Sequence, residues 1–226
     1  MGDLLRVAWA IAAKDVLLEF RSRTAFFSAL GFTALVLAIF QFAWDPTAVS
    51  AVDLAPGILW ITFTFAGMLG LNRAFALERE NRALDGLLLS PASRTAIYLG
   101  KVLANLVFVG AVEAIALPLF ALFFNVPIGR VLGPLLLVIA LATVGFVAVG
   151  TLMSSMAVNT RLAELMLPLL LLPFLVPPVM AAAQMTARLF AGRPFSETAG
   201  WLRLLVGYDI IFVAACILFF ESTIEE

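Results

Sequence analysis

The sequence predicts an all-α, polytopic membrane protein with six transmembrane helices. Of the 226 residues, 63% are hydrophobic and only 13% are charged, and the mean hydropathy is +1.09. A soluble helical protein of this composition would have too little polar surface to cover its core. Six apolar segments are long enough, at about 1.5 Å of rise per residue, to cross a hydrocarbon layer of about 30 Å.

The expected spans lie within one transmembrane domain, residues 1–226, and cover residues 24–44, 54–71, 102–124, 131–153, 163–180 and 201–220. The ionisable residues that fall well inside them are Glu113, Arg203 and Asp209, whereas Glu164 stands at the very start of the fifth. Such residues are costly in a membrane and often functional, so these three are candidate site residues. We expect Glu113 to face protein or a water-lined cavity, where a hydrogen bond to Asn105 or to a Ser or Thr hydroxyl would be a purely structural use.

The first 23 residues are expected to form an interfacial amphipathic helix. Apolar side chains recur at helical spacing, and charged ones fall on the other side. The apolar set is Leu5, Trp9, Ala12, Val16 and Phe20, and the charged set is Asp3, Arg6, Lys14 and Arg21. A fraying cytosolic tail is the alternative. A secretory signal is excluded, because charges interrupt the apolar region and no small-residue cleavage site follows.

The distribution of Lys and Arg between alternate loops predicts the orientation, because these residues are retained on the cytoplasmic side. One side receives ten of them: Arg6, Lys14, Arg21, Arg23, Arg73, Arg79, Arg82, Arg94, Lys101 and Arg161. The other side receives four: Arg130, Arg188, Arg193 and Arg203. Both termini are therefore expected in the cytoplasm.

The composition also excludes several classes of chemistry. The chain has no histidine, so His-based acid–base catalysis and bis-histidine heme ligation are ruled out. The segment Gly145 to Thr151 has glycines spaced as in a phosphate-binding loop, but it lacks the lysine and lies in an apolar span, which indicates a helix-packing face. Cys216 is expected to pack in the last span. We expect no enzymatic activity, no metal site and, at a net charge of −1, no nucleic-acid partner.

A polar stretch between the second and third spans is the strongest functional signal. It carries eight charged residues and is expected to touch a soluble partner: Arg73, Glu78, Arg79, Glu80, Arg82, Asp85, Arg94 and Lys101. Within it, residues 77–90 alternate leucines and charges as a short surface helix would. The dipeptide Ser90-Pro91 is expected to end that helix and to cap the next one.

Several segments resemble the CcmB family, the heme exporter protein B permeases of the cytochrome c maturation system. They are Lys14-Asp15 with Arg21-Ser22-Arg23, Leu71 to Glu80, Leu84 to Pro91, Ile97 to Lys101, Ala157 to Arg161 with the proline-rich run after it, and Trp201 to Glu226. The resemblance spans nearly the whole chain. It implies an ABC-2-type permease fold in the cytoplasmic (inner) membrane, in which residues 1–23 form the connecting helix.

The resemblance also implies partners and a coupling site. Two copies of the permease would pair with two copies of the ATPase subunit CcmA, which binds ATP and Mg²⁺, and would be joined by CcmC and CcmD. The complex would export heme, release the heme-loaded chaperone CcmE, or do both. Residues 77–90 would be the coupling helix that docks on the ATPase, through Glu78, Arg79, Glu80, Asp85, Gly86, Leu87 and Leu88. Residues 181–199 would hold a short re-entrant element, and no cofactor would be bound directly by this chain.

Two other functions stay open at this point. One is an ABC-2 permease for a different amphiphile, such as a polysaccharide lipid or a drug, on the same fold. The other is a proton-coupled secondary transporter, which Glu113 and Asp209 suggest. Single-chain carriers usually show two comparable halves, and the sequence shows none.

Overall fold

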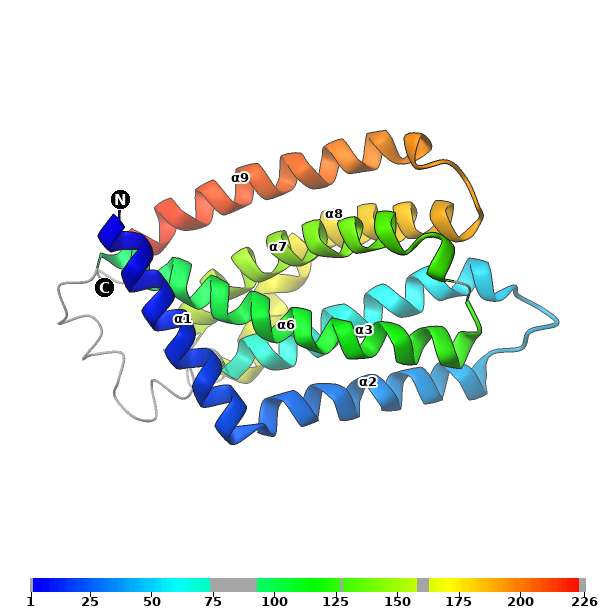
Figure 1. Cartoon of the computed structure of the whole chain (residues 1–226), viewed down its shortest axis with the longest axis horizontal. Helices are drawn as coiled ribbons and strands as arrows, with labels where there is room; N and C mark the ends of the chain where they lie inside the picture. Colours follow the sequence, from blue (N-terminus) through cyan, green and yellow to red (C-terminus); the bar gives the residue numbers. More distant parts are fainter. Residues whose placement is uncertain (1, 74–92, 127, 158–162, 224–226) are drawn as a thin grey trace.

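The computed structural model describes residues 2–73, 93–126, 128–157 and 163–223, and these residues form a bundle of long helices without strands. The elements are α1 (Gly2–Ser22), α2 (Thr24–Ala43), α3 (Ala51–Arg73), α6 (Arg94–Phe124), η1 (Ile128–Arg130), α7 (Leu132–Ala157), α8 (Ala163–Phe190), η2 (Phe195–Thr198) and α9 (Ala199–Thr223). Both chain ends lie at one end of the bundle (Figure 1). We call this the terminal end, and the opposite end the far end.

Six of the described helical segments are long and apolar enough to cross a membrane. They are Thr24–Ala43, Ala51–Asn72, Arg94–Phe124, Leu132–Ala157, Met166–Phe190 and Phe195–Phe220. The predicted fold class is therefore confirmed. The chain is a multi-pass membrane protein, and each of its six spans overlaps the segment that hydropathy indicated.

Two helices extend beyond the limits expected from the sequence. α6 begins at Arg94 rather than at residue 102, because Ser93 caps it by accepting a hydrogen bond from the Ala96 amide at 3.2 Å. The expected cap, Ser90, lies outside the described residues. α8 continues to Phe190, so residues 181–190 extend that helix instead of starting a separate re-entrant element. Its four prolines do not end it, since membrane helices tolerate proline where neighbouring groups satisfy the freed carbonyls.

α1 lies across the terminal end of the bundle, steeply inclined to the spans (Figure 1). The chain turns out of it at Arg23, which has a positive φ of 54°. Glu19 Oε1 then accepts a hydrogen bond from the Phe26 amide at 3.3 Å, which satisfies one of the free N–H groups in the first turn of α2. The sharp turn separates a helix lying on the bundle from one running through it.

The residues through which α1 packs on the bundle coincide only in part with those on its apolar, interfacial face. Leu5 and Trp9, placed on the apolar face, are 61% and 70% exposed. The buried positions are Ala8, Ile11 and Ala12, and they pack against α6. Small side chains allow the two helices to approach closely, whereas the larger ones are left on the outer surface of the described chain.

Candidate functional site

The coupling residues lie outside the part of the chain that the structure describes. These are Glu78, Arg79, Glu80, Asp85, Gly86, Leu87 and Leu88, all within residues 74–92. The coupling helix expected at residues 77–90 therefore stays a prediction. The site that can be built from coordinates consists of the polar groups inside the spans and of the contact between α1 and α6.

Glu113 is buried in α6, with only 8% of its surface exposed. Its two carboxyl oxygens accept a hydrogen bond from the Thr143 hydroxyl on α7, at 2.8 Å for Oε1 and 2.9 Å for Oε2. The sequence predicted that Asn105 or a Ser or Thr hydroxyl would be the hydrogen-bond partner of Glu113, and in the structure the partner is the Thr143 hydroxyl. Asn105 instead donates its Nδ2 to Thr151 Oγ1 at 2.9 Å, two turns away on the same pair of helices.

A small cavity adjoins the Glu113 carboxyl group. Its volume is about 20 Å³, counted as the space open to the centre of a water molecule, which is enough for about one water. Its walls come from α3, α6, α7 and α8, and the lining residues are Trp60, Phe63, Thr64, Glu113, Ala142, Thr143, Phe146, Pro178 and Val179. Glu113 thus faces protein and a cavity that can hold water, and not lipid.

Asp209 is the second buried carboxyl group in a span, and its surroundings differ. It is 8% exposed and packs against Gly145 of α7, where an added Cβ would collide with its Oδ1. Neither oxygen has a hydrogen-bond partner among the described residues. Gly145 therefore does serve as a helix-packing residue, as the sequence indicated, and the space it leaves is filled by Asp209 and the ring of Tyr208.

Arg203, the third ionisable residue expected inside a span, lies near the start of α9 and is exposed. Its Nε donates to the Ala199 carbonyl oxygen at 3.3 Å, one turn earlier on the same helix. The side chain therefore sits at the far end of the bundle, where no intramembrane role is needed to explain it. Cys216 is 3% exposed and packs with Tyr98 and Phe220, which confirms the packing role expected for it.

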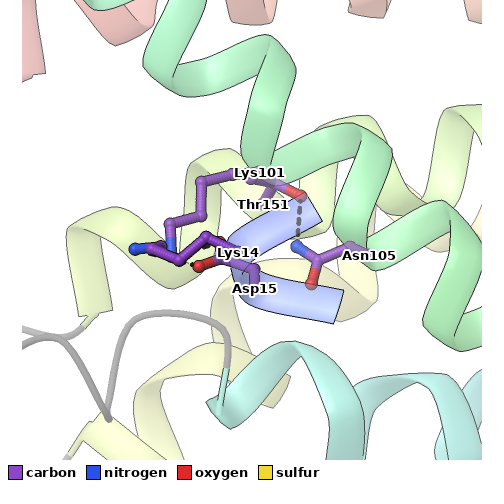
Figure 2. Close-up of polar contacts among 5 residues, drawn as sticks. All are labelled: Lys14, Asp15, Lys101, Asn105 and Thr151. Atoms are coloured by element: carbon purple, nitrogen blue, oxygen red, sulfur yellow. Dashed lines mark hydrogen bonds and ion pairs between the residues drawn. The ribbon is translucent and has the colours of Figure 1, made fainter. Parts of the chain in front are cut away.

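Lys101 is the residue that the sequence placed wrongly. It was grouped with the polar stretch that touches a soluble partner, but only 2% of it is exposed. Its Nζ lies 2.8 Å from Asp15 Oδ2 on α1, and Lys14 Nζ lies 3.0 Å from Asp15 Oδ1 (Figure 2). The acidic residue on α1 was the available signal, because a lysine one turn before Asn105 on a buried helix face needs a carboxylate partner.

Comparison with known proteins identifies the family. The family profile described as CcmB protein matches residues 6–224. The chain belongs to the CcmB family. It is 30% identical over 156 residues to "Heme exporter protein B" of Pseudomonas aeruginosa, which covers 69% of this chain and 70% of that protein. The Rhodobacter capsulatus protein of the same name is 32% identical over 118 residues, covering 52% of this chain and 54% of that protein.

The family assignment and the geometry fit together at the terminal end. The matched region includes α1, the polar stretch and all six spans. What the CcmB chain shows in its described part is a set of buried polar contacts that run from α1 into α6 and from α6 into α7.

Proposed function

We propose that this chain is the membrane permease subunit of a heme-exporting ABC-2-type complex that acts in cytochrome c maturation. The family match over residues 6–224 carries the proposal, together with relatives named for heme export and six membrane-competent helices. In this proposal a separate subunit, CcmA, hydrolyses ATP, and its work drives heme export, release of heme-loaded CcmE, or both. CcmC and CcmD complete the assembly, in which the permease is a homodimer.

The proposed location is the cytoplasmic (inner) membrane, with both termini in the cytoplasm. The terminal end then faces the ATPase, and the far end, with Arg130, Arg188, Arg193 and Arg203, faces outward. Labelling of single cysteines in a Cys216→Ser background tests this orientation. Ser50→Cys should react from the outside and Asn81→Cys from the inside, and the reverse pattern would overturn it.

The ATPase is proposed to dock on residues 77–90. Replacement of Leu87 and Leu88 by Asp should abolish co-purification of the ATPase with the tagged chain in mild detergent, because a few apolar anchors dominate most interfaces. Val49→Asp is the matched control, since Val49 is 44% exposed at the far end. Retained association in the double variant would contradict the docking site, while absence of any ATPase with the unmodified chain would contradict the proposed function.

Heme is proposed to be cargo, or to be held by partner subunits, and not to be ligated by this chain. Axial iron ligands in proteins are His, Met, Cys thiolate or Tyr, and the chain has no His. Cys216 is buried in an apolar helix, and Met185 is fully buried in α8. Heme added to the purified chain should give no stoichiometric low-spin absorption spectrum. Such a spectrum, lost on mutation of a Met or of Cys216, would contradict this.

The buried carboxyl groups favour one second candidate, a proton-coupled transporter. Glu113 adjoins a cavity with room for water, and Asp209 has no partner among the described residues. Glu113→Gln and Asp209→Asn separate the two functions in vesicles. An ABC permease should keep ATP-dependent activity without a proton gradient, and Glu113→Gln should assemble normally because the amide oxygen can still accept from Thr143. Gradient-dependent transport that both variants abolish would favour the carrier.

A further inference from the structure

The contact between α1 and α6 is unusually close at one point, Gly100. A Cβ atom added there would lie 2.8 Å from the Ala8 carbonyl oxygen and 2.8 Å from Ile11 Cβ. Both distances are shorter than side chains tolerate, and one of the obstructing atoms belongs to the backbone. The two helices therefore touch through their main chains at Gly100, and only glycine fits without moving α1.

A buried ion pair lies beside that point of contact. Lys101 follows Gly100 directly, and its ammonium group lies 2.8 Å from Asp15 Oδ2. The Lys101 side chain is 3% exposed and that of Asp15 is 15% exposed. Among the described residues, Asp15 Oδ2 accepts no hydrogen bond from any other donor. A buried charge is tolerated when it is paired, and removal of one partner is much more costly than replacement of both by apolar groups.

Lys14 does not share this environment. Its Nζ lies 3.0 Å from Asp15 Oδ1, but its side chain is 41% exposed. An exposed pair contributes little, because water screens the charges. Figure 2 shows the side chains of Lys14 and Lys101 both reaching toward the Asp15 carboxylate. Lys14 and Asp15 both belong to α1, so of these two ion pairs only the one with Lys101 joins α1 to α6.

From this joint, polar contacts continue along α6 into α7. Asn105 lies one helical turn after Lys101 and donates to Thr151, and Glu113 lies two further turns along and accepts from Thr143. Hydrogen bonds between membrane helices fix their relative register. The Tyr98 hydroxyl of α6 also donates to the Ala148 carbonyl oxygen of α7 at 3.0 Å. α6 is thus tied to α1 on one side and to α7 at three residues, Tyr98, Asn105 and Glu113, on another.

We propose that Gly100, Lys101 and Asp15 form a fixed joint between α1 and α6, so that a displacement of α1 moves the α6–α7 pair instead of being absorbed at the contact. Asp15 and Lys101 act as positioning residues, since they act through the contact between α1 and α6. The direction of transmission, from an ATPase at the terminal end into the spans, rests on the proposed function. The joint itself does not.

Hydrogen exchange of residues 2–22, measured by mass spectrometry on the full chain in lipid nanodiscs, tests the joint without reference to activity. Asp15→Asn should raise the exchange rate of these residues at least about ten-fold, because the buried ion pair that joins α1 to α6 is then lost. Asp3→Asn is the matched control, since Asp3 is an exposed carboxylate on the same helix. It should exchange as the unmodified chain does.

The double variant Asp15→Asn with Lys101→Met distinguishes a specific pair from general damage. It removes both charges, so its exchange should fall back toward that of the unmodified chain. If residues 2–22 of the single variant Asp15→Asn exchanged at the wild-type rate, the proposed joint would be wrong. The joint would also be wrong if the increases in exchange rate caused by Asp15→Asn and by Lys101→Met simply multiplied in the double variant.

The consequence for coupling is tested separately, on the assembled complex. Asp15→Asn should keep the ATPase bound, since residues 77–90 are untouched, but should lower cytochrome c maturation at least about five-fold, a coupling loss of about 1 kcal/mol. The double variant should recover part of the activity. Faster hydrogen exchange of α1 together with normal cytochrome c maturation would contradict the proposal that α1 passes its movement to α6 and α7. Failure of the unmodified chain to bind an ATPase would count against the proposed function and leave the exchange result standing.

Discussion

The two ends of the bundle are held together by different interactions. At the far end the core is mainly aromatic and aliphatic: Phe120 is 1% exposed, its ring centroid lies 5.3 Å from that of Phe124, and the ring of Phe190 stacks on that of Phe120 at 6.5 Å. One buried hydrogen bond also crosses this cluster, from Trp60 Nε1 to Thr186 Oγ1 at 2.9 Å. Toward the terminal end, buried polar groups cross the interfaces, including Lys101 to Asp15 and Asn105 to Thr151. Buried polar groups that are paired specify one arrangement of the helices.

The glycines show the same contrast. Among the described residues, five glycines sit where an added Cβ would meet a neighbouring helix at less than 3.0 Å, and all belong to the middle or the terminal half of the bundle: Gly67, Gly70, Gly100, Gly145 and Gly150. The glycines of the far end, such as Gly57 and Gly133, have open space around them. Glycines in close contact with a neighbouring helix and buried polar pairs therefore occur together in the half that we propose is driven by the ATPase, although only Gly100 meets a backbone atom.

The largest effect on stability is expected in the aromatic cluster of the far end. Phe120→Ala should lower the free energy of unfolding by about 3 kcal/mol, the low end of the range for soluble cores, because lipid is as apolar as the core and mainly packing is lost. Leu122→Ala is the control, since Leu122 is 77% exposed. Equal losses in a denaturant titration of the two variants in detergent micelles would show that the cluster is not a packed core.

A smaller effect is expected where polar groups cross from α6 to α7. Thr143→Val leaves the Glu113 carboxyl group without its described partner, and should cost up to about 1.7 kcal/mol. Thr151→Val removes the acceptor of Asn105, a neutral group, and should cost about 0.6 kcal/mol. The same titration measures both variants. A greater loss for Thr151→Val would reverse the order of the two contacts.

The smallest effect is expected in the loop before α3. Thr47 donates to Asp45 Oδ1 through its hydroxyl at 2.6 Å and its amide at 2.8 Å, and these bonds lower the pKa of Asp45 below its ordinary value of 3.8. Ionised Asp45 therefore favours the folded loop above that pH, and the contribution is lost as the pH falls through the lowered pKa. Thr47→Val should raise the pKa toward 3.8, measured by NMR of the carboxyl carbon. An unchanged pKa would show that the hydroxyl has no influence.

Much of the fold could be predicted because hydropathy decides where membrane helices lie. The six spans follow from long apolar runs, and Glu113 could be placed against protein because a carboxyl group facing lipid is too costly. The ends of the helices were harder to predict from the sequence. Ser93 and Ser90 are equally good caps by residue type, and the four prolines of α8 suggested a break that neighbouring helices make unnecessary.

The terminal-end contacts could not be predicted, because they depend on which faces meet. Leu5 and Trp9 dominate the hydrophobic pattern of α1, yet the helix packs through Ala8 and Ile11, and the absence of a side chain at Gly100 permits this close approach. Lys101 appears in the sequence as part of a charged stretch, and only the position of α1 across α6 turns it into a buried partner of Asp15.

The most direct test of the joint between α1 and α6 is the exchange rate of residues 2–22 in Gly100→Ala compared with Gly110→Ala. Both substitutions lie on α6, but only the first places a methyl group against α1, since Gly110 has no atom within 4 Å of an added Cβ. We expect faster exchange in Gly100→Ala alone, because a rigid contact has no room for a methyl group. Equal exchange in the two variants would contradict the account.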